Sequence, residues 1–105
     1  MRYRIRTEAV GARTVYHLHD DETGTSASVL PSYGFNLFDL RLPVAGRARP
    51  IVWAEPNWAA NPGRPGRNGI PVLFPFPNRI RGGHYRFGGK EYQLPLNRMP
   101  NAIHG

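Results

Sequence analysis

Short runs of alternating apolar and polar residues, separated by turn-forming residues, most restrict what this chain can fold into. Successive side chains of a β-strand point to opposite faces of its sheet, so such alternation is typical of strands with one covered face. The pattern predicts five strands in the first half of the chain, at residues 3–7, 13–20, 26–30, 35–42 and 50–54. No apolar stripe of useful length has the 3.6-residue period of a helix, so we expect an all-β protein.

A further pair of strands is predicted around Gly88 and Gly89. The residues before and after them, 84–87 and 90–94, both alternate. Two adjacent glycines can adopt the positive φ angles that a tight hairpin turn needs. This hairpin is the strongest local prediction that the sequence supports.

The chain between residues 56 and 69 has no periodicity and is rich in glycine and proline. We expect a long ordered loop there, at the rim of one domain. The apolar run at residues 70–76 contains two prolines, which lack the N–H donor of a central strand. We therefore expect this run to be an extended segment at a sheet edge or rim. The length of 105 residues suits one small domain.

The formal net charge is +7, from thirteen arginines and a single lysine against seven acids. The arginines are dispersed, which favours a composition bias over a nucleic-acid-binding surface, although a basic nucleic-acid-binding β-barrel stays open as a third interpretation. The absence of cysteine excludes disulfides and thiolate chemistry. The start of the chain is polar, and no apolar stretch approaches the roughly 20 residues that span a bilayer. We expect a cytoplasmic protein with no membrane contact.

Arg79 and His104 are the candidate site residues. Arg79 lies in an extended segment, and its guanidinium carries five donors in a fixed fork that suits a polyhydroxylated or anionic ligand. His104 can donate or accept a hydrogen bond near neutral pH, and the glycine that follows it permits close approach of a ligand to the backbone. From chemistry alone, the favoured interpretations are a surface arginine for Arg79 and a partly buried structural histidine for His104.

Two other groups of side chains have structural explanations. His17 and His19 point to the same face of a predicted strand, but no third metal ligand lies at a suitable spacing, so we expect an exposed strand face and no metal site. Four aromatic residues can either line a sugar-stacking surface or anchor the core and the loops, and the second interpretation is favoured. They are Trp53, Trp58, Phe74 and Phe76.

Three ordered motifs, at residues 69–80, 87–94 and 101–105, resemble the aldose 1-epimerase (galactose mutarotase-like) family, which includes relatives that act on hexose 6-phosphates. Residues 1–55 agree more loosely. The resemblance implies an antiparallel β-supersandwich with a sugar-binding cleft on one face. It further implies that residues 1–105 are the N-terminal part of a single domain of this kind, and an incomplete portion of it.

The resemblance also implies roles for individual residues. Arg79 matches the family's Asn-Arg motif, whose arginine binds substrate hydroxyls, and His104 matches the Asn-x-x-His-Gly motif, whose histidine contacts the sugar. Asn78 is a weaker binding residue, implied by its place beside Arg79. The general-acid histidine and general-base glutamate of the family lie beyond residue 105, so no catalytic residue is expected within this segment. Arg98 departs from the family pattern and adds a positive charge that hints at a phosphorylated or acidic sugar.

The sequence therefore predicts an isomerase of the aldose 1-epimerase type, which interconverts the α and β anomers of a hexose or hexose phosphate. Ring opening needs one proton delivered to the ring oxygen and one removed from the anomeric hydroxyl, and a positioned acid and base achieve this without a metal or organic cofactor. Its partner is a small-molecule sugar, with no nucleic acid and no membrane. We expect the 105-residue segment alone to be inactive. The alternative is a non-catalytic carbohydrate-binding protein on the same scaffold.

Overall fold

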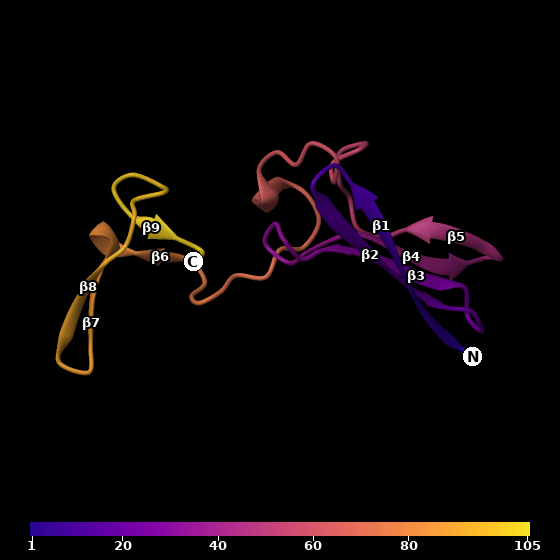
Figure 1. Cartoon of the computed structure of the whole chain (residues 1–105), viewed down its shortest axis with the longest axis horizontal. Coiled ribbons are helices and arrows are strands. Elements are labelled where there is room, and N and C mark those ends of the chain that lie inside the picture. Colours follow the sequence, from indigo (N-terminus) through magenta and orange to yellow (C-terminus); the bar gives the residue numbers. More distant parts are fainter. The chain divides into compact units, whose positions relative to one another are not determined.

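The computed structural model describes all 105 residues, and the chain divides into two units, Met1–Val72 and Leu73–Gly105. Each unit is described by itself. Both are built from antiparallel strands, and two short 3-10 turns, Pro65–Arg67 (η1) and Arg81–Gly83 (η2), are the only helical elements (Figure 1). The prediction of an all-β, antiparallel protein is confirmed. That residues 1–105 belong to a single domain stays a prediction.

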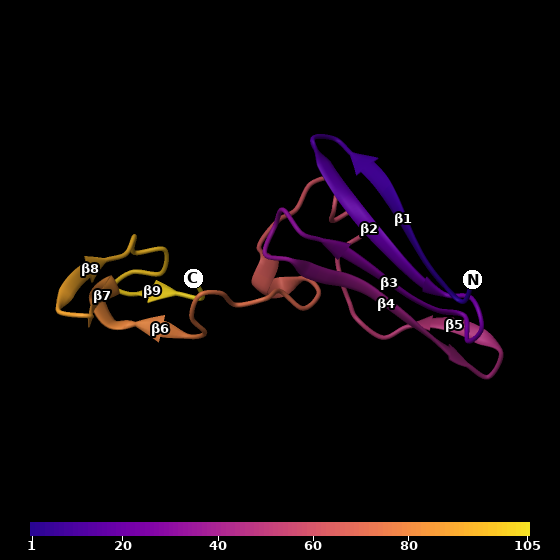
Figure 2. The same cartoon turned by 60° about the horizontal axis from the view of Figure 1, so that its bottom comes forward.

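The first unit is a five-stranded antiparallel sheet in which each strand pairs with the next along the chain (Figures 1 and 2). Its strands are β1 (Tyr3–Val10), β2 (Arg13–Asp20), β3 (Thr25–Leu30), β4 (Asn36–Val44) and β5 (Arg47–Pro50). The first four lie where the alternating pattern places them. Short turns at the strand ends allow consecutive strands to pair without a crossover.

The fifth predicted strand, at residues 50–54, is wrong. The chain reverses at Ala45 and Gly46, which have φ angles of 50° and 73°, and pairing with β4 resumes at once with Val44 opposite Arg47. A two-residue turn with positive φ at both positions gives the twist that a tight hairpin needs. The strand therefore ends at Pro50, and the apolar residues that follow leave the sheet.

The core of the first unit lies between the sheet and residues 53–60. Val15 of β2, Leu30 of β3 and Trp58 of the loop are 1%, 0% and 2% exposed. The Trp58 ring also packs against Tyr33 and Phe38, at ring-centroid distances of 6.0 and 5.6 Å. Trp58 is thus a core residue, as the favoured interpretation of the aromatic residues predicts, and the loop covers one face of the sheet.

The register of β2 contradicts the prediction that His17 lies on an exposed strand face. Val15 points into the core, so alternation turns His17 to the same covered face, where its side chain is 17% exposed. The apolar side chains of Tyr16 and Leu18 point to the other face. The sequence alone shows the alternation, but the packing of Val15 decides which half of it is covered.

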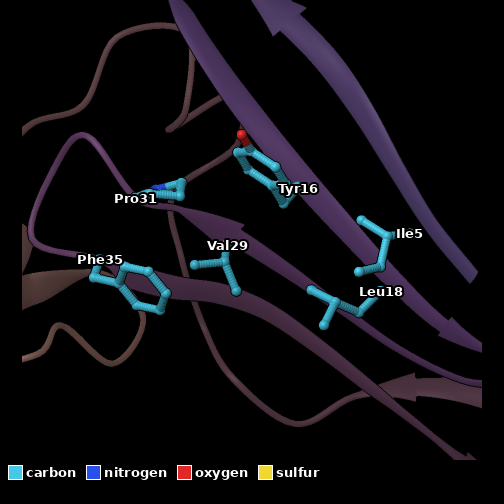
Figure 3. A pocket seen from close by; sticks show the side chains of 6 residues that line it. All are labelled: Ile5, Tyr16, Leu18, Val29, Pro31 and Phe35. Carbon is cyan, nitrogen blue, oxygen red and sulfur yellow. The ribbon is translucent and has the colours of Figure 1, made fainter.

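The open face of the sheet carries a hollow of about 350 Å³ with an entirely apolar lining (Figure 3). Figure 3 shows these side chains on neighbouring strands and on the turn before β4. The lining residues are Ile5, Tyr16, Leu18, Val29, Pro31 and Phe35. With almost no polar group to orient a ligand, this hollow is a poor candidate for sugar recognition.

Two buried asparagines fasten the loop at residues 56–69 to the sheet. Asn36 Nδ2 donates to the carbonyl oxygen of Asn68 at 2.7 Å, and Asn68 Oδ1 accepts the backbone N–H of Glu55 at 2.7 Å. The N–H of Gly69 donates to the carbonyl oxygen of Trp53 at 2.8 Å. These bonds satisfy buried polar groups that no strand serves, so they hold the loop in one conformation.

Beyond this loop the chain runs along the first residues of β4. Ile70 and Leu37 exchange two backbone hydrogen bonds of 2.9 and 3.2 Å, and the N–H of Val72 donates to the carbonyl oxygen of Gly34 at 2.8 Å. Pro71 lies between the two paired residues, and its missing N–H falls on the side away from β4, as at the edge of a sheet. The prediction of an extended edge segment is confirmed for its first three residues.

Ion pairs at one end of β1 and β2 give the first unit an acid-sensitive edge. Arg2 donates two hydrogen bonds to the Asp20 carboxylate, at 3.0 and 3.1 Å, and Arg4 pairs with Asp21. The hydrogen bond from Arg2 is the main cause that lowers the pKa of Asp20 from 3.8 to about 2. These contacts also pair two of the basic side chains near the N-terminus with acids of the same unit.

We therefore expect acid to weaken the pairing of β1 with β2. A carboxyl whose pKa is lower in the folded state contributes stability above its unfolded pKa, and loses it as the pH falls through the folded one. For Asp20 this window runs from 3.8 down to about 2. The protection factors of the β1 amides, which correct for the intrinsic effect of pH on exchange, should fall through this range in the native chain and change less in Asp20→Asn. An equal acid response of both proteins would contradict the assignment.

The second unit contains two pairs of short strands. The strands β6 (Arg79–Ile80) and β9 (Ala102–Ile103) pair with each other, and β7 (His84–Phe87) and β8 (Lys90–Gln93) form a hairpin closed by Gly88 and Gly89 (Figure 1). The rings of Tyr85 and Tyr92 stack across this hairpin at 5.0 Å. The predicted hairpin is confirmed. Its local pattern and its turn residues require the same structure, which explains why sequence reasoning succeeds there.

Candidate functional site

The short β6–β9 ladder brings the predicted site residues together within the second unit. Arg79 lies opposite Ile103 in the antiparallel register, so Asn78 and His104 occupy adjoining ends of the ladder. The N–H of His104 donates to the carbonyl oxygen of Asn78 at 2.9 Å. Asn78 and His104, which are 26 positions apart in the sequence, are thereby fixed as neighbours.

The imidazole of His104 is held by the backbone of Asn78. The N–H of Asn78 donates to His104 Nδ1 at 3.0 Å. Since Nδ1 accepts this bond, the proton of the neutral ring lies on Nε2, which becomes the nitrogen that can donate to a ligand. Both residues have positive φ angles, 58° for Asn78 and 65° for His104, which asparagine adopts at little cost and histidine less often.

The guanidinium of Arg79 is positioned by the side chain of Asn78. Arg79 Nη1 donates to Asn78 Oδ1 at 3.1 Å, which leaves the other guanidinium donors free. Asn78 therefore contacts both candidates: its side chain binds Arg79 and its backbone binds His104. All three residues are exposed to solvent, so a small ligand can reach them.

The second unit has a strong excess of positive charge. It contains five cationic side chains and one acid, Glu91, which is hydrogen-bonded to His84 at 3.3 Å in the hairpin. No carboxylate pairs with Arg79 or Arg98. Arg98 is tied to the unit by two backbone hydrogen bonds with Asn101, of 2.8 and 3.1 Å. No group of three His, Asp or Glu side chains converges to hold a metal ion.

Two further asparagines support the site, and sequence reasoning assigned them no role. Asn97 Oδ1 accepts the N–H of Ile103 at 2.8 Å and its Nδ2 donates to the carbonyl oxygen of Ile103 at 2.9 Å, as a third strand would. Asn101 Oδ1 accepts the N–H of Gly82 at 3.2 Å. Asparagine is common in turns because it bonds nearby backbone, but that preference does not identify the distant partner.

The glycine after His104 has a different reason from the predicted one. A Cβ atom on Gly105 would lie 2.0 Å from the carbonyl oxygen of Phe74 and 2.6 Å from the nitrogen of Pro75. The group that closely approaches Gly105 is therefore the backbone of Phe74 and Pro75. This contact holds the residues on both sides of the site, because residue 105 lies against the segment that leads into Asn78.

The arrangement supplies hydrogen-bond donors and lacks a base. Arg79 and the Nε2–H of His104 both suit acceptor oxygens such as sugar hydroxyls. Proton removal from an anomeric hydroxyl needs a basic group within hydrogen-bond reach, and no carboxylate bonds to any of the three site residues.

Comparison with known proteins gives a family and several relatives to which this chain is similar. The family model described as aldose 1-epimerase matches residues 14–105. The uncharacterized protein YihR of Escherichia coli K12 is 58% identical over 36 residues, 32% of this chain and 12% of that protein. The galactose mutarotases of mouse and rat are 61% and 57% identical over 28 residues, 27% of this chain and 8% of theirs. The matches thus span a small part of each relative's length.

No helix of the structure has both the length and the apolar character needed to cross a membrane. The family model covers nearly the whole chain and includes the Asn-Arg and Asn-x-x-His-Gly motifs, with Arg79 and His104 brought together by the ladder that joins them. The resemblance on which the sequence analysis depended is thereby confirmed. The chain belongs to the aldose 1-epimerase family.

Proposed function

We propose that this chain provides the sugar-binding residues of an isomerase that interconverts the anomers of a hexose. The observation that carries the proposal is the junction of Arg79, Asn78 and His104 at one end of the β6–β9 ladder. Membership of the aldose 1-epimerase family supports it, as does the likeness to two galactose mutarotases. Arg79 and His104 bind sugar hydroxyls, and Asn78 positions both.

In the proposed reaction, the bound sugar opens its ring when an acid protonates the ring oxygen and a base removes the proton of the anomeric hydroxyl. Rotation about the C1–C2 bond and closure with the roles reversed give the other anomer. Arg79 and His104 hold the hydroxyls of the pyranose while these protons move, which fixes the ring against the acid and the base. We assign the acid and the base to residues outside 1–105.

Binding and turnover can be measured separately on the 105-residue chain. We expect saturation-transfer NMR to detect galactose or glucose on the native chain, and the signal to fall about tenfold in Arg79→Ala, the cost of one charge-assisted hydrogen bond. Arg86→Ala, which removes a cation from the hairpin, is the matched control. Polarimetry with fresh α-galactose should show no acceleration over the spontaneous rate. Acceleration that His104→Ala abolishes would show that residues 1–105 contain the catalytic groups.

A more specific form of this proposal is that the substrate is a phosphorylated hexose. Arg79 and Arg98 have no carboxylate partner, and five cations face one acid in the second unit, which favours an anionic sugar. Galactose 6-phosphate should then bind more tightly than galactose, by a margin that shrinks as salt is added. Equal binding of both sugars would restrict the substrate to a neutral hexose.

A non-catalytic sugar-binding protein is the second candidate. It is favoured by one observation, that no carboxylate contacts Arg79, Asn78 or His104. Both candidates require the same sugar contacts and differ only in proton transfer. Polarimetry on the protein encoded by the complete reading frame separates them, since only the isomerase accelerates mutarotation.

A further inference from the structure

A second cavity lies in the first unit, on the loop-covered face of the sheet. Its volume is about 470 Å³, within the range of small-molecule sites. Strands β2, β3 and β4 line one side and residues 50–59 line the other. This cavity is formed by Met1–Val72 alone and shares no residue with the Arg79–His104 site.

The cation of this cavity and its histidine are already paired, and the carboxylate of Glu55, which also lines the cavity, has no ion-pair partner. Arg41 Nε donates to both oxygens of Asp39, at 2.9 and 3.3 Å. The two ring nitrogens of His17 contact Ser28 Oγ and Glu8 Oε2, each at 2.9 Å. An anionic ligand therefore finds no free cation, whereas the remaining lone pairs and donors of these groups can bind neutral hydroxyls.

One buried donor in the cavity wall has no acceptor in the chain. Trp58 is 2% exposed, and its Nε1–H makes no hydrogen bond with any protein atom. A buried polar group without a partner costs free energy, so most such groups are satisfied by water or by a ligand.

The rim of the cavity carries an exposed aromatic ring. Trp53 is 65% exposed although it is one of the largest apolar side chains of the chain. An indole ring offers an apolar face on which the C–H groups of a polyol can pack while its hydroxyls reach polar neighbours. Trp53 does not join the core, and it lies where a ligand with both an apolar and a polar surface would contact it.

We propose that the cavity between Trp53, Trp58 and the Asp39–Arg41 pair binds a neutral, hydroxyl-rich small molecule such as a monosaccharide or a polyol. Trp53 stacks on its apolar face, and Asp39 and Arg41 bind its hydroxyls. This site is additional to the one under the proposed function and does not depend on it.

The two tryptophans of the chain both line this cavity, so the emission of tryptophan reports on it alone. We expect titration of the purified chain with galactose or sorbitol to change the emission along a saturating curve, in the range of about millimolar dissociation constants. Trp53→Ala should remove the saturating change while the emission of Trp58 persists. Circular dichroism checks that the exposed substitution leaves the sheet folded.

Paired substitutions distinguish this cavity from other sites. Arg41→Ala should weaken binding by about tenfold, the loss of a charge-assisted hydrogen bond, whereas Arg47→Ala on β5, which lines no part of the cavity, should leave it within about twofold. Arg79→Ala should leave the tryptophan response unchanged even if it abolishes binding at the other site. The proposal is overturned if neither galactose nor sorbitol saturates, if only galactose 6-phosphate or spermidine does, or if Arg79→Ala removes the response.

Discussion

Replacement of Gly69 by alanine is expected to destabilise the first unit by about 3–5 kcal/mol, the combined cost of overpacking and of a left-handed backbone in a residue with a side chain. Gly69 has a φ angle of +62°. A Cβ atom there would lie 2.1 Å from Asn36 Oδ1, 2.5 Å from the carbonyl oxygen of Leu37 and 2.8 Å from the Cα of Phe38. Two of these three atoms belong to the backbone of β4 and cannot rotate away.

Gly66 provides the matched control in the same loop. It has no heavy atom within 4 Å of an added Cβ and no positive φ angle. Gly66→Ala should therefore be neutral, or stabilising by up to about 1 kcal/mol, because alanine restricts the unfolded chain. Urea unfolding followed by tryptophan fluorescence measures both proteins, since Trp58 is in the core of this unit. Equal midpoints for the two variants would show that the loop moves freely away from β4.

The tertiary contacts of this loop explain why the sequence predicts its position but not its conformation. Its lack of periodicity and its glycine and proline content indicate a loop at residues 56–69. The hydrogen bonds that fix it join Asn36 to Asn68, 32 positions away, and Asn68 to Glu55. The sequence does not show whether an asparagine is buried or which distant group it bonds. These hydrogen-bond partners are therefore known only from the folded chain.

Strands were predictable where local pattern and turn chemistry agree. The β7–β8 hairpin and β2 have alternation bounded by clear turn residues, and both lie where expected. The fifth strand was misplaced because the apolar run at residues 51–53 resembles a strand more than the arginine-rich β5 does. In the structure Val52 and Trp53 line the cavity of the first unit and Ile51 is exposed, so apolar character alone does not place this run in the sheet.

The sequence also does not show which face of each strand is covered. Alternation in β2 assigns Tyr16 and Leu18 to one face and His17 to the other, and hydrophobicity alone would turn the tyrosine and leucine inward. In the structure the single buried residue Val15 decides the opposite orientation. The candidate site was identified differently, through motif resemblance, and the roles of Arg79 and His104 in binding sugar stay predictions.

The second large effect is expected at His104, where alanine and asparagine should separate structure from binding. His104→Ala removes the acceptor of the Asn78 N–H and should cost about 1 kcal/mol of stability, the net value of one hydrogen bond. His104→Asn places an oxygen near the position of Nδ1 and tolerates the φ angle of 65°. Its stability should therefore stay within about 0.5 kcal/mol of the native chain.

Sugar affinity should not follow stability in these two variants. Asparagine restores the contact with Asn78 but does not extend to the position of Nε2, so both variants should lose about tenfold in galactose affinity, the value of one hydrogen bond. His84→Ala, at the hairpin, is the control and should bind as the native chain does. If His104→Asn binds galactose like the native chain, the imidazole serves only to hold the β6–β9 junction, and Arg79 alone is left as the sugar contact. Loss of binding without loss of stability is the result that a structural histidine cannot produce, because its whole effect would pass through the bond that asparagine keeps.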